Sequence, residues 1–426
     1  MDENTAPLLA AMPSDAASTS PTAKPAAPMP QLELLPYQRR ICEFLKRHDS
    51  DVWRWFASSK QQASHVEELK FDLLKSTYRI DRESSPLYDC AQEVAAALGL
   101  SASVTLYQAQ DPVGLNASLA YVPDEIHIVF HGPIATQLSA AELRGLLGHE
   151  LTHFLLWQGW NGDLLIASEM LAALANDRQA HSAHFASWRL LRLYTEIACD
   201  RGSLLVTRDM LTVVSMLVKV STGVQEVNPE SYLRQAEEIF ARGPGKTEGI
   251  THPEAFIRAR AIQLWSKQGT GADGVIAEMI EAGAELNEID LLHQEVVAGW
   301  TRRVIDLLLC HKWFQTDSAL AHARLYFDEY TPPTDELTDD LLAREMPLGS
   351  KSFRDYFCYL LLDFASSDRE LEEVPLAATL KVADQLGIQD RFVELARQEL
   401  RLRKNQIDKV KSDCEAILRE ADKAAP

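Results

Sequence analysis

Along most of the chain, hydrophobic residues recur at the three- and four-residue spacing of amphipathic helices. Between residues 34 and 98, for example, Ile41, Phe44 and Leu45 share one face, and this stretch predicts two or three helices. Helical spacing resumes at Asp163 and persists almost to the end of the chain. Three clusters rich in glycine or proline interrupt it and are candidate linkers: residues 243–245, 269–274 and 331–333.

A short central region has the pattern of β-strands instead. Ser103–Gln108, Leu119–Val122 and Ile126–Phe130 are rich in β-branched and aromatic residues, and Pro123 and Asp124 supply a turn between the last two. The chain is therefore predicted to be mainly α with a small β-sheet, and its C-terminal region is predicted to be all α.

Composition narrows the classes of partner. The 426 residues include 42 Lys and Arg against 62 Asp and Glu, a formal net charge of −20, which repels phosphate backbones and disfavours nucleic acid as a partner. No apolar stretch reaches the roughly 20 residues that a bilayer crossing needs, so no membrane span is predicted. The six cysteines are scattered without a CxxC pair and no secretory signal is visible, so we expect a cytoplasmic protein.

The most informative motif is HELTH at residues 149–153, an HExxH sequence. It lies in a predicted helix that begins after Ser139, because Ser139 and Glu142 form a capping-box pattern ahead of an apolar run. Residues four apart on a helix share one face, so the imidazoles of His149 and His153 can reach one zinc ion. The motif therefore predicts a zinc site on this helix.

Glu150 directly follows the first histidine and flanks the same helix face. Its carboxylate can take a proton from the attacking water instead of binding the metal, which makes it the candidate general base. The alternative is a solvated helix face that carries two histidines without a metal. The apolar neighbours Leu147, Leu151 and Phe154 disfavour it, because they predict a buried helix.

A catalytic zinc site needs a third protein ligand, and two carboxylates downstream are candidates. Glu196 and Asp200 are one helical turn apart, so they share one helix face, and Arg201 and Gly202 follow. HExxH followed by this ExxxD segment resembles the HtpX and CAAX-prenyl-protease group of zinc metallopeptidases. The resemblance implies that Glu196 is the third zinc ligand and that Asp200 orients a ligand histidine. Pairing with Arg201 or a neighbouring helix is the alternative role for Asp200.

Two further segments extend this resemblance to about residues 70–265. Asn116-Ala117 resembles the family's NAFA segment, a strand that lines the substrate cleft in relatives, although Ser118-Leu119 depart from that pattern. The resemblance implies that this strand pairs with an extended substrate.

The second segment is Thr251-His252-Pro253 with Arg258 after it, which resembles a late family segment whose histidine helps to stabilise the oxyanion. The resemblance implies that role for His252. Membrane members of the family insert apolar hairpins around the catalytic helices, whereas residues 161–195 here contain many charged side chains. This departure indicates a soluble member and favours cytosolic polypeptides as substrates.

The predicted organisation has three parts. A disordered tail rich in Pro and Ala (1–33) precedes a zinc metallopeptidase domain of α+β, gluzincin-like type (34–267), and a helical C-terminal region (268–426) follows. Within the last part, residues 353–400 loosely resemble TerB-like helical domains.

These patterns predict a zinc-dependent endopeptidase that hydrolyses cytosolic polypeptides. Zn²⁺ is held by His149, His153 and Glu196, Glu150 is the general base, and His252 is the second catalytic residue. The alternative is a non-catalytic protein in which zinc stabilises the fold and the C-terminal helices bind a partner. Structural zinc sites are normally closed by four protein ligands, and three ligands with an intact glutamate favour the enzyme.

Overall fold

The computed structural model describes eight stretches of the chain. The predicted tail lies, up to residue 31, outside the described residues, and so do Thr251 and most of the candidate linker at 243–245. The described stretches are residues 32–59, 63–83, 85–110, 114–178, 181–243, 252–281, 285–334 and 350–424.

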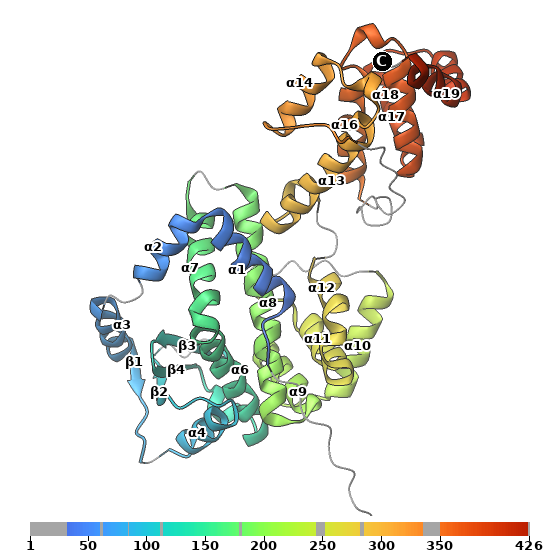
Figure 1. Ribbon diagram of the computed structural model, residues 1–426. Coiled ribbons are helices and arrows are strands. Elements are labelled where there is room, and N and C mark those ends of the chain that lie inside the picture. The colour runs from blue at the N-terminus through green and yellow to red at the C-terminus, as the bar shows by residue number, and fades with distance from the viewer. Residues whose placement is uncertain are drawn as a thin grey trace, which may run out of the picture. The chain divides into compact units, whose positions relative to one another are not determined.

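The described chain is mainly α with one small β-sheet, as the sequence predicts (Figure 1). Within the described stretches, each helix is too short or too polar to cross a membrane. The helices up to residue 281 are α1 (Pro36–His48), α2 (Ser50–Ser59), α3 (Ala63–Ser76), α4 (Leu87–Ala97), α5 (Ile134–Gln137), α6 (Ala140–Gln158), α7 (Asp163–Asn176), α8 (Ser182–Thr207), α9 (Met210–Thr222), α10 (Pro229–Ala241), α11 (Ala255–Gln268) and α12 (Asp273–Glu281). The C-terminal helices are α13 (Leu291–Leu309), α14 (Asp317–Tyr326), α16 (Lys351–Ala365), α17 (Val374–Gln385), α18 (Gln389–Glu399) and α19 (Lys404–Ala424).

The sheet has four strands in the order β1-β2-β4-β3. The three predicted strands are confirmed, and the pattern missed β1, whose three residues are too few for a periodic signal. β2 and β4 are parallel, whereas β1 and β3 pair antiparallel with their neighbours, so β3 forms one edge of the sheet. The strands are β1 (Thr77–Arg79), β2 (Ser103–Ala109), β3 (Asn116–Val122) and β4 (Glu125–His131).

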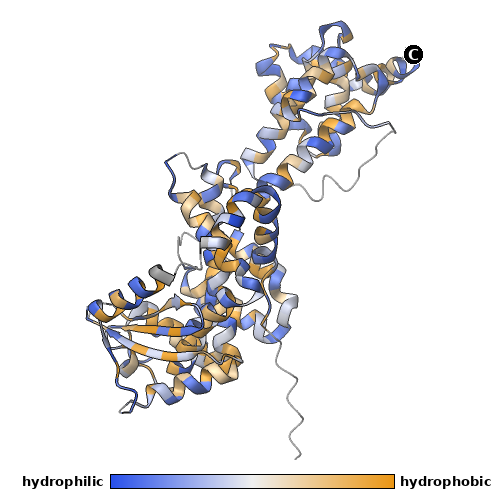
Figure 2. Cartoon of the chain, turned by 60° about the vertical axis from the view of Figure 1, so that its left-hand side comes forward, coloured by the Kyte–Doolittle hydropathy of each residue, from blue (hydrophilic) through white to orange (hydrophobic). Residues whose placement is uncertain are grey.

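The sheet is covered on both faces. Ile128 and Phe130 of β4 are fully buried in the main core with α4 and α6, whereas Val129 packs with Leu73 of α3 and Tyr107 of β2 on the other face. Figure 2 shows the resulting alternation of hydrophobic and hydrophilic residues along the strands. The β3 edge remains without a strand partner among the described residues.

Helix α6 begins where the sequence predicts. Ser139 accepts a hydrogen bond from the Glu142 amide, and the Glu142 carboxylate accepts one from the Ser139 amide at 2.8 Å. The same carboxylate accepts hydrogen bonds from Ser215 and Lys219 of α9 at 2.7 and 2.8 Å. The helix start is therefore tied to a neighbouring helix as well as capped.

Hydrophobic side chains gather in two large cores. The first contains α1, the sheet and helices α4 to α12, and it includes Ile276 and Ile280 of α12. The glycine-rich break at 269–274 forms a 3-10 turn in which Ala272 is fully buried, so it turns the chain within this core. The boundary predicted after residue 267 implies that residues 34–267 fold independently, and this stays a prediction.

The second core lies among the C-terminal helices. It runs from Val304 on α13 to Leu418 on α19 and contains four fully buried phenylalanines. Helix α13 contributes to both cores, because Leu292 near its start belongs to the first. The described part of this region is all α, whereas its likeness to TerB-like domains stays a prediction.

Candidate functional site

Glycines let the helix of the HExxH motif approach α8 very closely. A Cβ atom on Gly202 of α8 would lie 1.7 Å from the hydroxyl of Thr152, and one on Gly148 of α6 would lie 2.4 Å from a methyl of Val206. Neither distance allows a larger side chain without movement of a helix. The close crossing brings the histidines of α6 against the carboxylates of α8.

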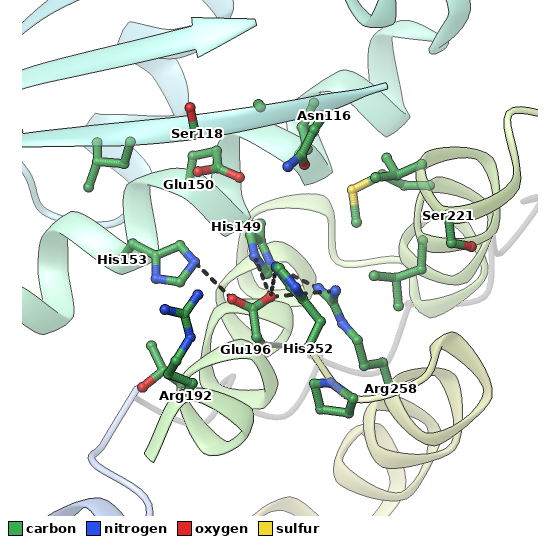
Figure 3. Close-up of a pocket in the computed structure, with 18 of the residues that line it drawn as sticks. Asn116, Ser118, His149, Glu150, His153, Arg192, Glu196, Ser221, His252 and Arg258 are labelled. Carbon is green, nitrogen blue, oxygen red and sulfur yellow. Dashed lines mark hydrogen bonds and ion pairs between the residues drawn. The ribbon is translucent and has the colours of Figure 1, made fainter. Parts of the chain in front are cut away.

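His149, His153 and Glu196 meet at this crossing (Figure 3). The carboxylate of Glu196 lies 3.3 Å from Nε2 of His149 and 3.5 Å from Nε2 of His153. The two imidazole rings are 5.1 Å apart and nearly perpendicular. Glu196 therefore lies between the two histidines, with Oε2 beside His149 and Oε1 beside His153.

This donor set fits a zinc ion. Ligand bonds of 2.0–2.1 Å at tetrahedral angles place neighbouring donor atoms about 3.3 Å apart, close to the two distances to Glu196. Glu196 Oε2 is buried and accepts no hydrogen bond among the described residues, although His149, His252 and Arg258 lie 3.3–3.6 Å from it. A buried carboxylate oxygen is costly unless something satisfies it, and a bound cation would do so.

Cys199 is a metal-ligand candidate that sequence reasoning missed. Donor atoms of His149, His153 and Cys199 all lie within 4.8 Å of one another. Burial raises the pKa of this thiol well above its ordinary value, which keeps it protonated in the absence of a metal. Glu196 lines the cavity described below and Cys199 does not, so the carboxylate is placed better for a site that must meet substrate.

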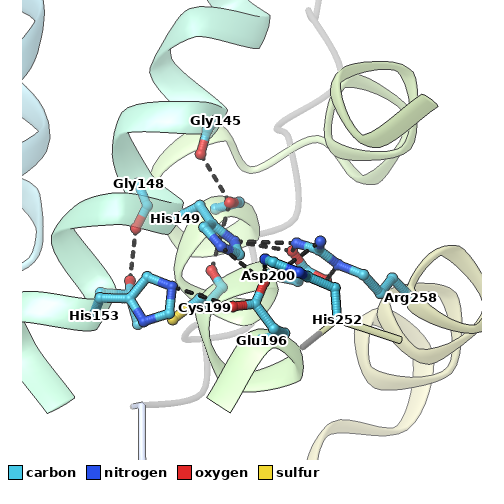
Figure 4. Close-up of polar contacts among 11 residues, drawn as sticks. Gly145, Gly148, His149, His153, Glu196, Cys199, Asp200, His252 and Arg258 are labelled. Atoms are coloured by element: carbon cyan, nitrogen blue, oxygen red, sulfur yellow. Dashed lines mark hydrogen bonds and ion pairs between the residues drawn. The ribbon is translucent and has the colours of Figure 1, made fainter. Parts of the chain in front are cut away.

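Asp200 contacts the Nδ1 atom of His149, whereas Glu196 lies beside its Nε2 atom (Figure 4). Its Oδ1 is 3.1 Å from Nδ1 of His149, and the residue is 1% exposed. Arg258 of α11 donates to both carboxylate oxygens of Asp200, at 2.8 and 2.6 Å, and its Nη1 lies 3.5 Å from Glu196. The arginine therefore neutralises a carboxylate that would otherwise be buried with a net charge.

The electrostatics of this cluster favour positive charge between the histidines and Glu196. Burial alone would lower the pKa of His149, but its hydrogen bond to Asp200 and the adjacent carboxylate of Glu196 raise that pKa to about 10. Burial would likewise raise the pKa of Glu196, but the two histidines hold it well below its ordinary value. Surroundings that stabilise a proton on His149 also suit a metal cation at the same place.

Glu150 lines the same cavity, but it is not one of the metal-ligand candidates. Figure 3 shows its carboxylate turned toward β3, on the side of His149 away from Glu196. Burial raises its pKa, although the neighbouring histidines act in the opposite direction. A carboxylate with a raised pKa is a better proton acceptor than an ordinary one, as a general base requires.

His252 lies at the mouth of the site. Its side chain is 50% exposed, and its Nε2 is 3.6 Å from Glu196 Oε2. Burial of part of the ring lowers the pKa of His252, opposed by the charge of Glu196. At neutral pH the ring is thus favoured in its uncharged form, which still carries one N–H donor.

These residues line one cavity of about 660 Å³. The β3 edge forms one wall, from Asn116 to Leu119. Its remaining lining combines apolar side chains with one more arginine. The apolar side chains include Leu115, Leu146, Met216, Leu217 and Val220, and Trp157, Ser168 and Arg192 also line the cavity.

All six residues singled out from the sequence lie within this cluster or beside it. They are His149, Glu150, His153, Glu196, Asp200 and His252. Sequence reasoning assigned no role to Arg258, Cys199 or Arg192. The sequence signal for Arg258 is that arginines follow His252. The sequence signal for Cys199 is its place between Glu196 and Asp200 on α8.

Comparison with known proteins supports a metallopeptidase. Over 200 residues the chain is 30% identical to an Arabidopsis thaliana protein named plastoglobule-localized metallopeptidase 48, chloroplastic. The match covers 43% of this chain and 57% of that protein, so this chain spans little more than half of its relative's length. No family model and no solved structure matches the chain. The similarity and the possible metal site agree on a metal-dependent peptidase, without distinguishing the HtpX and CAAX-prenyl-protease group.

Proposed function

We propose that the protein is a zinc-dependent endopeptidase that cleaves flexible polypeptides. One observation carries the proposal: two histidines and Glu196 converge at zinc-ligand separations inside a cavity that also holds the carboxylate of Glu150. The similarity to a metallopeptidase supports it. Within this proposal His149, His153 and Glu196 are the metal ligands, and Asp200 orients His149 through Nδ1.

In the reaction, a bound zinc ion would supply Lewis acidity that polarises the peptide carbonyl and acidifies water. Glu150 takes the proton from the attacking water and returns it to the leaving amine. His252 donates a hydrogen bond to the carbonyl oxygen as negative charge develops there. Arg258 keeps Asp200 ionised, and Asp200 in turn holds the ring of His149 in place.

The edge of β3 is suited to hold an extended substrate. Its outer backbone groups have no strand partner among the described residues, and Asn116–Leu119 face the cavity. A peptide in extended form can add to such an edge through main-chain hydrogen bonds, which are independent of its sequence. This geometry favours unfolded segments over folded proteins as substrates.

The cytoplasmic location stays a prediction. The relative found by comparison is named as chloroplastic and plastoglobule-localised. Fractionation of cells with an antibody to this protein would test the compartment independently of its activity.

A non-catalytic protein with a structural metal site is the competing function. Such a site would be closed by four protein ligands, and Cys199 is near enough to provide a fourth. The cavity disfavours this function, because Glu150 and the β3 edge meet the site on its open side. A closed structural site requires neither Glu150 nor the β3 edge.

The decisive experiment compares the zinc-loaded protein with its Glu150→Gln variant on unstructured casein. Glu150→Gln should retain stoichiometric zinc and an unchanged melting temperature, while hydrolysis falls by about 10³-fold or more. The exposed Glu238 of α10 provides a matched control, and Glu238→Gln should cleave casein at the unchanged rate. Equal cleavage by the protein and by Glu150→Gln would contradict the proposed function.

A further inference from the structure

Arg192 is a cation in the cavity that the proposed mechanism does not use. It lies on α8 one helical turn before Glu196, so both side chains project from the same face of the helix. Figure 3 shows Arg192 close to His153, with its guanidinium turned toward the part of the cavity that holds that ring. The side chain is half-buried and lines the cavity together with Trp157.

Arg192 differs from the other arginines near the site in having no carboxylate partner within the described stretches. Arg258 is bound to Asp200, and Arg201 donates to Asp273 at 2.7 Å. The contact recorded for Arg192 is with the ring of Trp188, 5.1 Å from its guanidinium carbon. In a chain with a net charge of −20, a cation that lines a cavity and forms no ion pair with a carboxylate of the described residues is unusual.

The stack on Trp188 prepares this guanidinium for a ligand. Trp188 packs against the main core, and the guanidinium of Arg192 lies over its ring, which leaves the N–H donors at the guanidinium edge available. A guanidinium presents several N–H donors in a fixed plane and matches a carboxylate with two parallel hydrogen bonds. Because the guanidinium is already held over Trp188, binding costs less side-chain entropy than for a free arginine.

We propose that Arg192 binds a carboxylate of the substrate, so that the enzyme selects polypeptides with negative charge on the Trp157 side of the scissile bond. The inference rests on the proposed peptidase function and names its substrate class. Two sources present this chemistry: an internal Asp or Glu side chain, and the C-terminal carboxylate of the chain being cleaved.

The geometry sets the position of that charge. One turn of α8 between Arg192 and Glu196 corresponds to about 6 Å, and an extended peptide advances about 3.3 Å per residue. The selected carboxylate therefore belongs to a residue about two positions from the scissile bond.

The test uses fluorogenic peptides that differ only in charge at these positions. Glu and Gln peptides with blocked ends test the internal side chain, in both orders around the scissile bond. A Gln peptide with a free C-terminus at the same position, compared with its amide, tests the terminal carboxylate. The measured quantity is the ratio of kcat/KM between the charged and uncharged member of each pair.

For the zinc-loaded protein, at least one pair should favour the charged peptide by about tenfold. Arg192→Gln should bring that ratio close to one, and Arg192→Glu should favour a Lys peptide over the Glu peptide. The exposed Arg234 of α10 is the matched control, and Arg234→Gln should retain the original ratio. A ratio near one in every pair, or a ratio that survives Arg192→Gln, would overturn the inference.

Binding separates this inference from the proposed function. Fluorescence anisotropy with the Glu150→Gln protein measures the affinity for the same peptides without cleavage. Preference for the charged peptide that is lost in Glu150→Gln/Arg192→Gln supports the carboxylate site, even if the unsubstituted protein cleaves neither the peptides nor casein. Equal affinity for charged and uncharged peptides overturns the inference, while casein cleavage continues to report on the peptidase.

Discussion

Two polar clusters contact helix α8. They contain similar side chains, but the hydrogen bonds within one cluster satisfy its polar groups and those within the other do not. The first, here called the metal cluster, consists of His149, His153, Glu196, Asp200 and Arg258. The second, here called the tyrosine cluster, consists of Tyr37, Tyr194, Glu281, Asp290 and His293. Each combines histidine with two carboxylates, yet only the metal cluster opens into the large cavity.

The tyrosine cluster satisfies its polar groups internally. Tyr37 donates to Asp290 at 2.6 Å, Tyr194 donates to Glu281, and the two tyrosine rings stack 4.7 Å apart. The two nitrogens of His293 lie 2.5 Å from Asp290 and 3.4 Å from Glu281. Asp290 also caps α13 by accepting from the His293 amide. The polar groups of this cluster thus contact one another and link α1, α8, α12 and α13.

In the metal cluster, hydrogen bonds satisfy Asp200 but not the whole of Glu196. Asp200 is fully occupied by Arg258 and His149, whereas Glu196 Oε2 has no hydrogen-bond partner among the described residues. The unsatisfied atom faces the point where the histidines converge. The presence of histidines and carboxylates therefore does not by itself indicate function. A buried acceptor that receives no hydrogen bond, at a cavity and beside two histidines, is a stronger indication.

The largest expected difference between the clusters concerns the metal. Glu196→Ala should lower zinc affinity more than about a hundredfold, because it removes a ligand instead of a supporting group. Metal content after dialysis, measured by elemental analysis, checks this. Cys199→Ala is the matched substitution on the same helix and should keep stoichiometric zinc. The reverse pattern would assign the ligand position to the thiol.

The next effect concerns catalysis and leaves the metal in place. His252→Ala should lower kcat on casein-derived peptides by about 10²–10³-fold with little change in KM, as expected for loss of a donor to the developing oxyanion. Zinc content should stay unchanged, because His252 lies at the mouth of the site. An unchanged kcat would make His252 a structural loop residue.

The metal cluster was more predictable from sequence than the tyrosine cluster. The histidines of α6 and the carboxylates of α8 lie on single helices at fixed spacing, so local periodicity places each pair on one face. Asp290 and Tyr37 are 253 positions apart and belong to no motif. Their contact depends on how α1 and α13 pack, and periodicity carries no information about packing partners.

The same reasoning explains which parts of the fold were predicted. The cap at Ser139 and the strands β2 to β4 have local signals and are confirmed. The turn at Gly269–Ala272 has the composition of a linker, but Ala272 is buried because α12 returns to the first core. Glycine in a sequence marks a change of direction without telling whether it occurs inside a core or between cores.

The tyrosine cluster should contribute to stability instead of metal binding. Asp290 is 1% exposed and accepts three hydrogen bonds, so Asp290→Ala should lower the free energy of unfolding by about 2–4 kcal/mol. Urea unfolding of the zinc-loaded protein measures this. Glu295 is the matched control on the same helix, because its contact with Arg47 is exposed, and Glu295→Ala should cost less than about 1 kcal/mol. Loss of zinc from Asp290→Ala would contradict the separation of the two clusters.

The smallest expected effect is a pH dependence that belongs to the tyrosine cluster. Hydrogen bonds to Asp290 and Glu281 raise the pKa of His293 to about 10, against the opposing effect of burial. A raised pKa in the folded state stabilises the fold fully below the unfolded value of about 6.5, and this contribution is lost as the pH rises through 10. His293 is 39% exposed, so solvent screens much of it. The difference in unfolding free energy between the protein and His293→Gln, measured in urea at pH 6 to 10 with zinc present, should therefore shrink as the pH rises. A difference that stays constant or grows over this range would show that the charge of His293 does not stabilise the cluster.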